Sequence, residues 1–151
     1  MKKFQFPLDT VLDYRRQMQD ALQVELSALM AESRRQEAAL DAARRQYARI
    51  NAEYGEKQAG GMQIAEIRGY ETGLEVQSAV VAREADRLQK IHQQVESKRR
   101  ELVQAKQDAS SVEKLREKKL KGYLLAAEKS EEQFLDDLVG ARSARTSDGL
   151  L

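Results

Sequence analysis

The sequence has no cysteine and no tryptophan, and only one histidine and one proline among its 151 residues. Without cysteine the chain forms no disulfide and no thiolate-based metal site. His92 stands alone, and because histidine in catalysis or metal binding acts together with partners, we interpret it as a surface residue. Aromatic residues make up only 5% of the chain. So few large apolar side chains argue against the core of a compact globule.

Other absences exclude whole classes of function. The pair Gly60-Gly61 is not followed by the Lys-Ser/Thr of a phosphate-binding loop. The 26 basic and 25 acidic residues nearly cancel, which argues against a general grip on nucleic acid or anionic lipid. No apolar run approaches the roughly 20 residues that span a bilayer, and none follows Lys2-Lys3 as in a signal peptide. We therefore expect no enzyme, no cofactor and no nucleic-acid partner, but a protein that works by contacting other proteins.

What is present favours long helices. Charged residues are 34% of the chain, and Ala, Glu, Gln, Lys, Arg and Leu dominate, as in coiled coils. Pro7 suits a first helical turn, and neither glycine nor proline interrupts residues 8–54, for which we predict one helix. Steps of three and four residues define its seam: Val11, Tyr14, Met18, Leu22, Leu26, Leu29, Ser33, Gln36, Leu40, Ala43, Tyr47, Ile50 and Tyr54. Successive four-residue steps near Met18 predict a stutter.

Glycine is absent before residue 55 and then becomes frequent. We predict a turn over residues 55–61, with the reversal at Gly60-Gly61, and a return helix over residues 62–139. Its seam contains Leu74, Val81, Leu88, Ile91, Val95, Lys98, Leu102, Ala105, Ala109 and Val112, then slips near Leu115 and continues through Leu120, Leu124, Ala127, Phe134 and Leu138. Gly140 is the predicted C-cap. The expected fold is all-α: residues 1–140 form a single antiparallel coiled-coil hairpin whose second helix is longer, followed by a disordered, flexible tail over residues 141–151.

The unequal helix lengths predict an exposed end. Residue 8 would lie opposite about residue 108, so the return helix would continue alone for about 30 residues. Its uncovered apolar side chains suggest a partner protein. The basic stretch from Lys98 to Lys121 is followed by an acidic one from Glu128 to Asp137. These charges are either a solvated face with pairs such as Glu117–Lys121 or a collar that meets an acidic protein.

The opening pattern Phe4-x-Phe6-x-Leu8-x-x-Val11-Leu12-x-x-Arg15-Arg16 resembles the N-terminal signature of the FliJ proteins of the bacterial flagellum. The length, the glycine-marked reversal, the basic return helix and the late acidic pairs are also similar. The resemblance implies a cytoplasmic component of the flagellar type III export apparatus, built like the central stalk of a rotary ATPase. It implies three partners: the hexameric export ATPase FliI, the export-gate membrane protein FlhA, and export chaperones. The protein would then be peripheral to the membrane only through these partners.

The resemblance also suggests where each partner binds. For the ATPase we assign the ends of both helices: Val11, Leu12, Arg15, Arg16, Leu115, Arg116, Lys119 and Lys121. For the gate we assign the helices that flank the turn, where Tyr47 and Tyr70 match aromatic positions of the family: Tyr47, Ile50, Tyr54, Tyr70 and Leu74. The same aromatics could instead seal the end of the coiled coil.

Alternative functions remain open at this point. The first is the equivalent stalk of an injectisome-type secretion system. The second is a generic coiled-coil chaperone or scaffold that dimerises through its uncovered stripe. A nucleic-acid clamp would predict binding that weakens steeply with salt.

Overall fold

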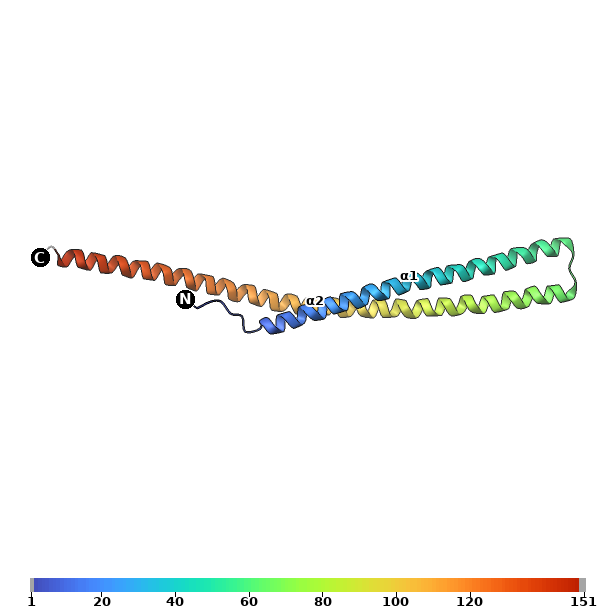
Figure 1. Ribbon diagram of the computed structural model, residues 1–151, viewed down its shortest axis with the longest axis horizontal. Coiled ribbons are helices and arrows are strands. Elements are labelled where there is room, and N and C mark those ends of the chain that lie inside the picture. Colours follow the sequence, from blue (N-terminus) through green and yellow to red (C-terminus); the bar gives the residue numbers. More distant parts are fainter. Residues whose placement is uncertain (1, 150–151) are drawn as a thin grey trace. The chain divides into compact units, whose positions relative to one another are not determined.

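The computed structural model describes residues 2–149, which form two helices and no strand. Helix α1 is Asp9–Gly60 and helix α2 is Ile64–Asp148 (Figure 1). The all-α prediction with a longer second helix is therefore confirmed. Packing divides the chain into two compact units. Unit 1 contains the two ends of the chain, up to Gln19 and from Ala105, and unit 2 is Asp20–Gln104. The predicted single domain over residues 1–140 stays a prediction.

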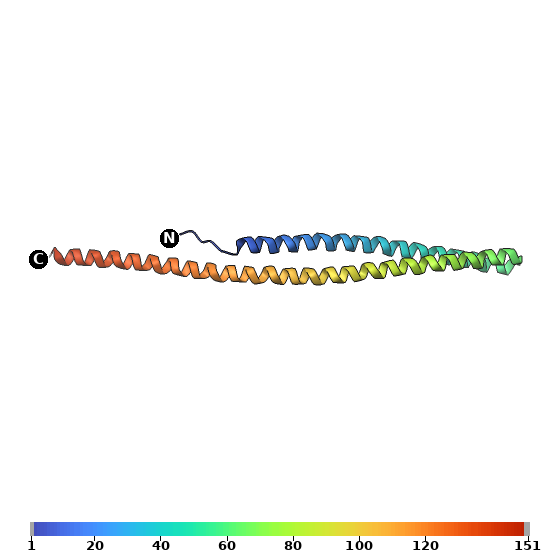
Figure 2. The same ribbon diagram turned by 90° about the horizontal axis from the view of Figure 1, so that it is seen from below.

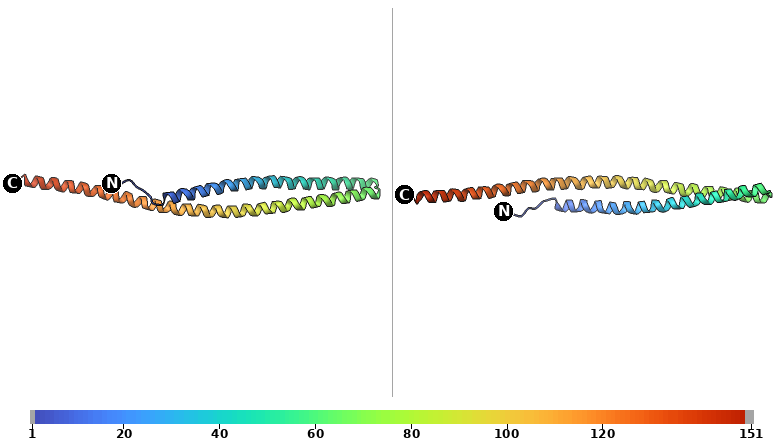
Figure 3. Two further views of the ribbon diagram at one scale, coloured as in Figure 1. Left: turned by 60° about the horizontal axis from the view of Figure 1, so that its bottom comes forward. Right: turned by 90° about the horizontal axis from the view of Figure 1, so that it is seen from above.

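In unit 2 the two helices run antiparallel, side by side, on either side of a short turn (Figure 3). Residues 61–63 form this turn, and Gly61 has a φ of 89°, in the left-handed region that glycine adopts without a steric cost. The predicted turn over residues 55–61 begins too early. Gly55 and Gly60 remain in α1, because an isolated glycine weakens a helix by about 1 kcal/mol without ending it.

A single apolar stripe from each helix forms the core of unit 2. Leu26, Ile91, Val95 and Leu102 are buried together, with Leu22 and Leu29 packed against them. Closer to the turn, Leu40 and Ala43 are buried as well. All of these are predicted seam positions, so the seam is confirmed here. The remaining faces of both helices are largely exposed, as expected of a coiled coil.

Polar side chains within this seam fix how the helices align. The Gln36 amide donates a hydrogen bond to the Glu84 carbonyl oxygen at 3.0 Å and another to the Glu84 carboxylate. Gln77 donates to the Ala43 carbonyl oxygen at 3.0 Å. An apolar stripe alone tolerates sliding by a heptad, whereas a polar residue at a seam position specifies one register. These bonds therefore set which residues of α1 and α2 face each other.

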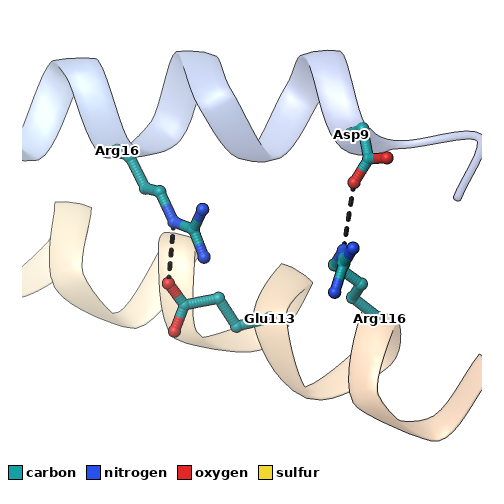
Figure 4. Close-up of polar contacts among 4 residues, drawn as sticks. All are labelled: Asp9, Arg16, Glu113 and Arg116. Carbon is teal, nitrogen blue, oxygen red and sulfur yellow. Dashed lines mark hydrogen bonds and ion pairs between the residues drawn. The ribbon is translucent and has the colours of Figure 1, made fainter. Parts of the chain in front are cut away.

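In unit 1 ion pairs hold the first turns of α1 against α2. Arg16 Nε lies 3.1 Å from Glu113 Oε1, and Arg116 Nε lies 3.2 Å from Asp9 Oδ1 (Figure 4). Residue 9 therefore lies opposite residue 116, and the predicted pairing of residue 8 with about residue 108 is wrong. The register differs because α1 continues to Gly60 and the turn is residues 61–63, whereas the predicted turn began at residue 55.

The buried stripe at the start of α1 also differs from the predicted seam. Leu12 is the most buried side chain, at 1% exposure, whereas Val11, Tyr14 and Met18 are 40%, 55% and 38% exposed. Arg15 and Gln19 are the half-buried positions instead. The steps from residue 12 to 15, 19 and 22 keep the alternation of three and four, so the predicted stutter is wrong. The buried positions continue the three- and four-residue spacing of the seam residues that follow in α1. The position of a residue around the helix therefore decides whether it is buried here, even where that residue is polar.

The segment before α1 packs on α2 without being helical. The Phe4 ring lies 5.5 Å from the Tyr123 ring, and the Tyr123 hydroxyl donates a hydrogen bond to the Lys2 carbonyl oxygen at 2.6 Å. The Arg116 guanidinium lies 5.5 Å from the centre of the Phe4 ring, and Phe6 is buried. This segment therefore extends the cover over α2 beyond the first residue of α1.

Past that cover, α2 continues as a single helix (Figures 1 and 2). Every residue from Glu128 to Gly149 is exposed. The second helix was predicted to end at residue 139 and to be followed by a flexible tail. Instead, α2 continues through Gly140 to Asp148. Good helix formers on both sides of Gly140 offset the cost of that one glycine. Residues 150 and 151 of the predicted tail lie outside the described residues.

Candidate functional site

Of the eight residues predicted to meet the ATPase, the structure makes seven accessible, all in unit 1. Leu12 is the correction: at 1% exposure it fills the space between the helices and cannot meet a partner. Arg15 and Arg116 are half-buried and the other five residues are exposed. We call this group the open-end surface: Val11, Arg15, Arg16, Leu115, Arg116, Lys119 and Lys121.

The three arginines of the open-end surface are engaged in pairs between the helices. Arg15 Nη1 lies 3.5 Å from Asp108 Oδ2. Arg16 pairs with Glu113, and Arg116 pairs with Asp9 (Figure 4). Each is a solvent-exposed pair, worth about 0–1 kcal/mol alone. Their combined effect is to hold the start of α1 at a defined position on α2. The arginines thus position the open-end surface, and its exposed Lys119 and Lys121 give it basic charge.

Sequence reasoning missed an apolar row next to this surface. Val11, Tyr14 and Met18 are spaced by three and four residues on one exposed face of α1. Their apolar character had placed them in the seam. The sequence does contain a signal: the two successive four-residue steps from Tyr14 to Met18 and from Met18 to Leu22. Such steps break the alternation of three and four, so residues that they connect do not all lie on the seam. The row gives the open-end surface an apolar part of the kind that protein partners cover.

The five residues predicted to meet the gate lie near the turn in unit 2, and we call them the turn-end surface. Tyr54 and Tyr70 stack with ring centroids 5.4 Å apart. The Tyr70 hydroxyl donates a hydrogen bond to Glu53 Oε1 at 2.9 Å. Partial desolvation, together with that bond, raises the pKa of Tyr70 above its usual 10.0. The Tyr54 ring of α1 thus packs on the Tyr70 ring of α2 near the turn, and whether these rings also meet the gate stays a prediction.

Tyr47 is the most open aromatic of the turn-end surface, with 37% exposure. It lines a shallow hollow of about 220 Å³ together with Arg44, Ser78 and Val81. Ile50 and Leu74 are half-buried between the hollow and the tyrosine stack. The structure therefore distinguishes two environments within the predicted group: Tyr54 and Tyr70 stack on each other, whereas Tyr47 is more exposed.

The single histidine lies in unit 2, on the exposed side of the helix pair. His92 lies 3.6 Å from Glu37, and both side chains are about half exposed, so His92 is the surface residue that the sequence indicated. Within residues 2–149, no group of three or more His, Asp or Glu side chains is placed to hold a metal ion. No helix in the described part is long and apolar enough to cross a membrane.

Comparison with known families identifies one match. Residues 4–147 match the family described as Flagellar FliJ protein, which includes the N-terminal segment, α1 and almost all of α2. The comparisons with curated proteins and with solved structures gave no match. The resemblance noted on Phe4, Phe6 and the residues that follow is thus confirmed along nearly the whole chain. The protein belongs to the FliJ family and is an accessory protein associated with flagellar export.

Proposed function

We propose that the chain is the stalk-like accessory protein of the flagellar type III export apparatus. In this proposal the open-end surface contacts the hexameric export ATPase and the turn-end surface contacts the export-gate membrane protein. The protein also exchanges export chaperones and works at the cytoplasmic face of the membrane only through these partners. The family match favours the flagellar system over the injectisome-type alternative, because the matched family is a flagellar one.

The observation that carries the ATPase contact is the construction of the open-end surface. Three ion pairs between the helices fix the first turns of α1 on α2. Beside them lie the exposed apolar row Val11, Tyr14 and Met18 and two exposed lysines. A pre-organised surface loses little conformational entropy when it binds. Such a surface, apolar in part and basic in part, suits a partner whose contact face combines apolar and acidic side chains.

The test is the effect of the chain on a purified flagellar export ATPase. Adding the wild-type chain should raise ATP hydrolysis and ring formation. The double substitution Lys119→Glu and Lys121→Glu should weaken that stimulation about tenfold, because it places four units of unfavourable charge change at the contact. Both lysines are exposed, so the variant should keep its helix content.

The matched control makes the same charge change on an exposed part of unit 2. Arg34→Glu with Arg35→Glu alters the net charge equally, at exposed positions of α1 away from the open-end surface. This control should stimulate as well as the wild type. If the wild type itself does not raise hydrolysis, the stalk function is wrong. If both double variants lose stimulation equally, general charge rather than the open-end surface is responsible.

The gate contact is tested separately, on Tyr47. Tyr47→Ala should weaken binding to the isolated cytoplasmic domain of the export gate, because the exposed ring that lines the hollow is lost. Val103→Ala, at another exposed apolar position of unit 2, should leave binding unchanged. Binding by fluorescence anisotropy or calorimetry gives both affinities. Equal affinity of wild type and Tyr47→Ala would contradict the assignment of Tyr47.

A further inference from the structure

The C-terminal part of α2 carries two adjacent blocks of opposite charge. Residues 114–121 contain five basic residues and one acidic, Glu117, and so have a net charge of +4. Residues 128–137 contain five acidic residues and one basic, Lys129, and so have a net charge of −4. Leu125 lies midway between the two blocks. The segment is therefore self-complementary in charge when it is reversed about Leu125.

This part of α2 has apolar side chains that nothing in the described chain covers. Leu124 and Leu125 are 55% and 60% exposed, and the outer end carries further exposed large apolar side chains: Phe134, Leu135, Leu138 and Val139. Helices in proteins draw most of their stability from packing an apolar face, and a single solvated helix lacks it. An exposed apolar stripe of this extent marks an interaction site.

We propose that a second copy of this chain covers the segment, with residues 112–139 of the two α2 helices paired antiparallel about Leu125. In that arrangement the +4 block of each copy faces the −4 block of the other. The position of Leu115 in one copy then corresponds to that of Leu135 in its partner, and Lys118 corresponds to Glu132. A parallel pair would instead place equal charges side by side, which is unfavourable.

The dimensions suit a two-helix contact. The charged blocks and the residues between them span residues 114–137, or about 36 Å of helix. That is about three heptads, enough for a coiled coil of moderate stability. The opposed blocks would also accelerate association through electrostatic steering, and salt would weaken this effect. Arg116 already pairs with Asp9, so the main attraction comes from Lys114, Lys118 and Lys119, whose positions correspond to Asp136, Glu132 and Glu131 of the other copy.

The pairing overlaps the open-end surface at Leu115, Lys119 and Lys121, so the paired form and an ATPase-bound form would exclude each other. The pairing itself does not depend on the proposed ATPase contact, because it rests on the charge order and exposure of this chain alone. Its test therefore uses the full chain with no other protein. Failure of one proposal leaves the other standing.

The first experiment exchanges the blocks. In analytical ultracentrifugation at low salt, the wild-type chain should dimerise in the micromolar to submillimolar range. Variant Lys114→Glu, Lys118→Glu, Lys119→Glu should be monomeric, and so should variant Glu131→Lys, Glu132→Lys, Asp136→Lys. Mixed one to one, the two variants should form a heterodimer. All six positions are exposed, so circular dichroism should show unchanged helix content.

The second experiment establishes whether the two α2 helices pair antiparallel or parallel. Because the sequence has no cysteine, an introduced cysteine is the only thiol that can cross-link. Leu125→Cys should form a disulfide with its own copy under mild oxidation. Lys118→Cys and Glu132→Cys should each cross-link poorly alone but efficiently when mixed. Efficient self-cross-linking of each of these two variants would indicate a parallel pair and overturn the proposal. A wild-type chain that stays monomeric at submillimolar concentration and low salt would overturn it as well.

Discussion

Asp9, the first residue of α1, accepts a hydrogen bond from the Arg116 guanidinium across the helix pair, and the same guanidinium lies over the Phe4 ring. One side chain of α2 thus contacts both the start of α1 and the segment before it. The contact joins the two parts of the N-terminal signature, the phenylalanines and the first helical turn, at a single residue.

Removing this side chain should loosen the N-terminal segment. Arg116→Ala deletes an exposed ion pair, worth about 0–1 kcal/mol, and a cation–π contact worth about 0.5–1 kcal/mol. We expect the free energy of unfolding in urea to fall by about 1 kcal/mol, and hydrogen exchange at the Asp9 and Leu12 amides to accelerate. Arg116→Lys keeps the positive charge but loses the planar group that lies over the Phe4 ring. Its free energy of unfolding should therefore lie between those of the wild type and Arg116→Ala. Unchanged exchange in Arg116→Ala would contradict the role given to this residue.

Two neighbouring residues test the burial frame of α1. Leu12→Ala should lower the free energy of unfolding by about 2–3 kcal/mol, because it removes a fully buried side chain from a pair of helices that can collapse only partly. Val11→Ala should cost less than about 1 kcal/mol, since Val11 is exposed and the substitution raises helix propensity. Chemical denaturation of both variants gives the comparison. A larger loss in Val11→Ala would restore the originally predicted seam.

Replacing glycine by alanine should have opposite effects on stability inside α1, at Gly55, and just after its last residue, at Gly61. Gly61→Ala forces a side chain into the left-handed region and should destabilise the chain by about 1–2 kcal/mol. Gly55 is helical and an added Cβ meets nothing within 4 Å. Gly55→Ala should therefore stabilise the chain by about 0.5–1 kcal/mol. Thermal unfolding by circular dichroism measures both; a stabilising Gly61→Ala would mean that the turn lies elsewhere.

Lys98 makes stability depend on pH in the alkaline range. Its ammonium donates hydrogen bonds to Glu25 at 2.8 Å and Glu101 at 2.9 Å, and these bonds raise its pKa above the ordinary 10.5. A raised pKa in the folded chain gives a stabilisation that is complete below pH 10.5 and disappears as the pH rises through the folded value. The wild type should therefore lose more stability between pH 9 and 11.5 than Lys98→Met does. Parallel urea midpoints for the two proteins would contradict this.

Much of the fold could be predicted because coiled coils repeat one rule along their length. The predicted seam residues from Leu22 to Ala43 and from Leu74 to Val112 are all buried or half-buried, as their spacing indicates, whereas Tyr47 is exposed. The prediction failed near the termini, where apolar type and helical phase disagree: Val11, Tyr14 and Met18 look like a seam, whereas Leu12 and the ion-paired Arg15 occupy it. The predicted reversal at Gly60-Gly61 agrees with the positive φ of Gly61, but the predicted turn begins too early, because residues 55–60 remain helical.

The candidate surfaces were harder to predict than the fold. The turn-end residues followed from their position near the reversal, but sequence could not tell that Tyr54 and Tyr70 stack on each other while Tyr47 remains open. The contacts of Phe4 with Tyr123 and of Lys2 with Tyr123 join residues at opposite ends of the chain. No periodic pattern reports such a contact, because the segment before α1 is not helical.

The antiparallel register has a consequence for the order of assembly. Near the turn, contacting residues are close in sequence, as in Tyr70 and Glu53, which are 17 apart. At the other extreme, Arg16 and Glu113 are 97 apart, and Lys2 and Tyr123 are 121 apart. Long loops are slow and entropically costly to close. The open-end surface therefore forms only after the residues of α2 that face the start of α1 have been synthesised, so it is the part of the helix pair that assembles last.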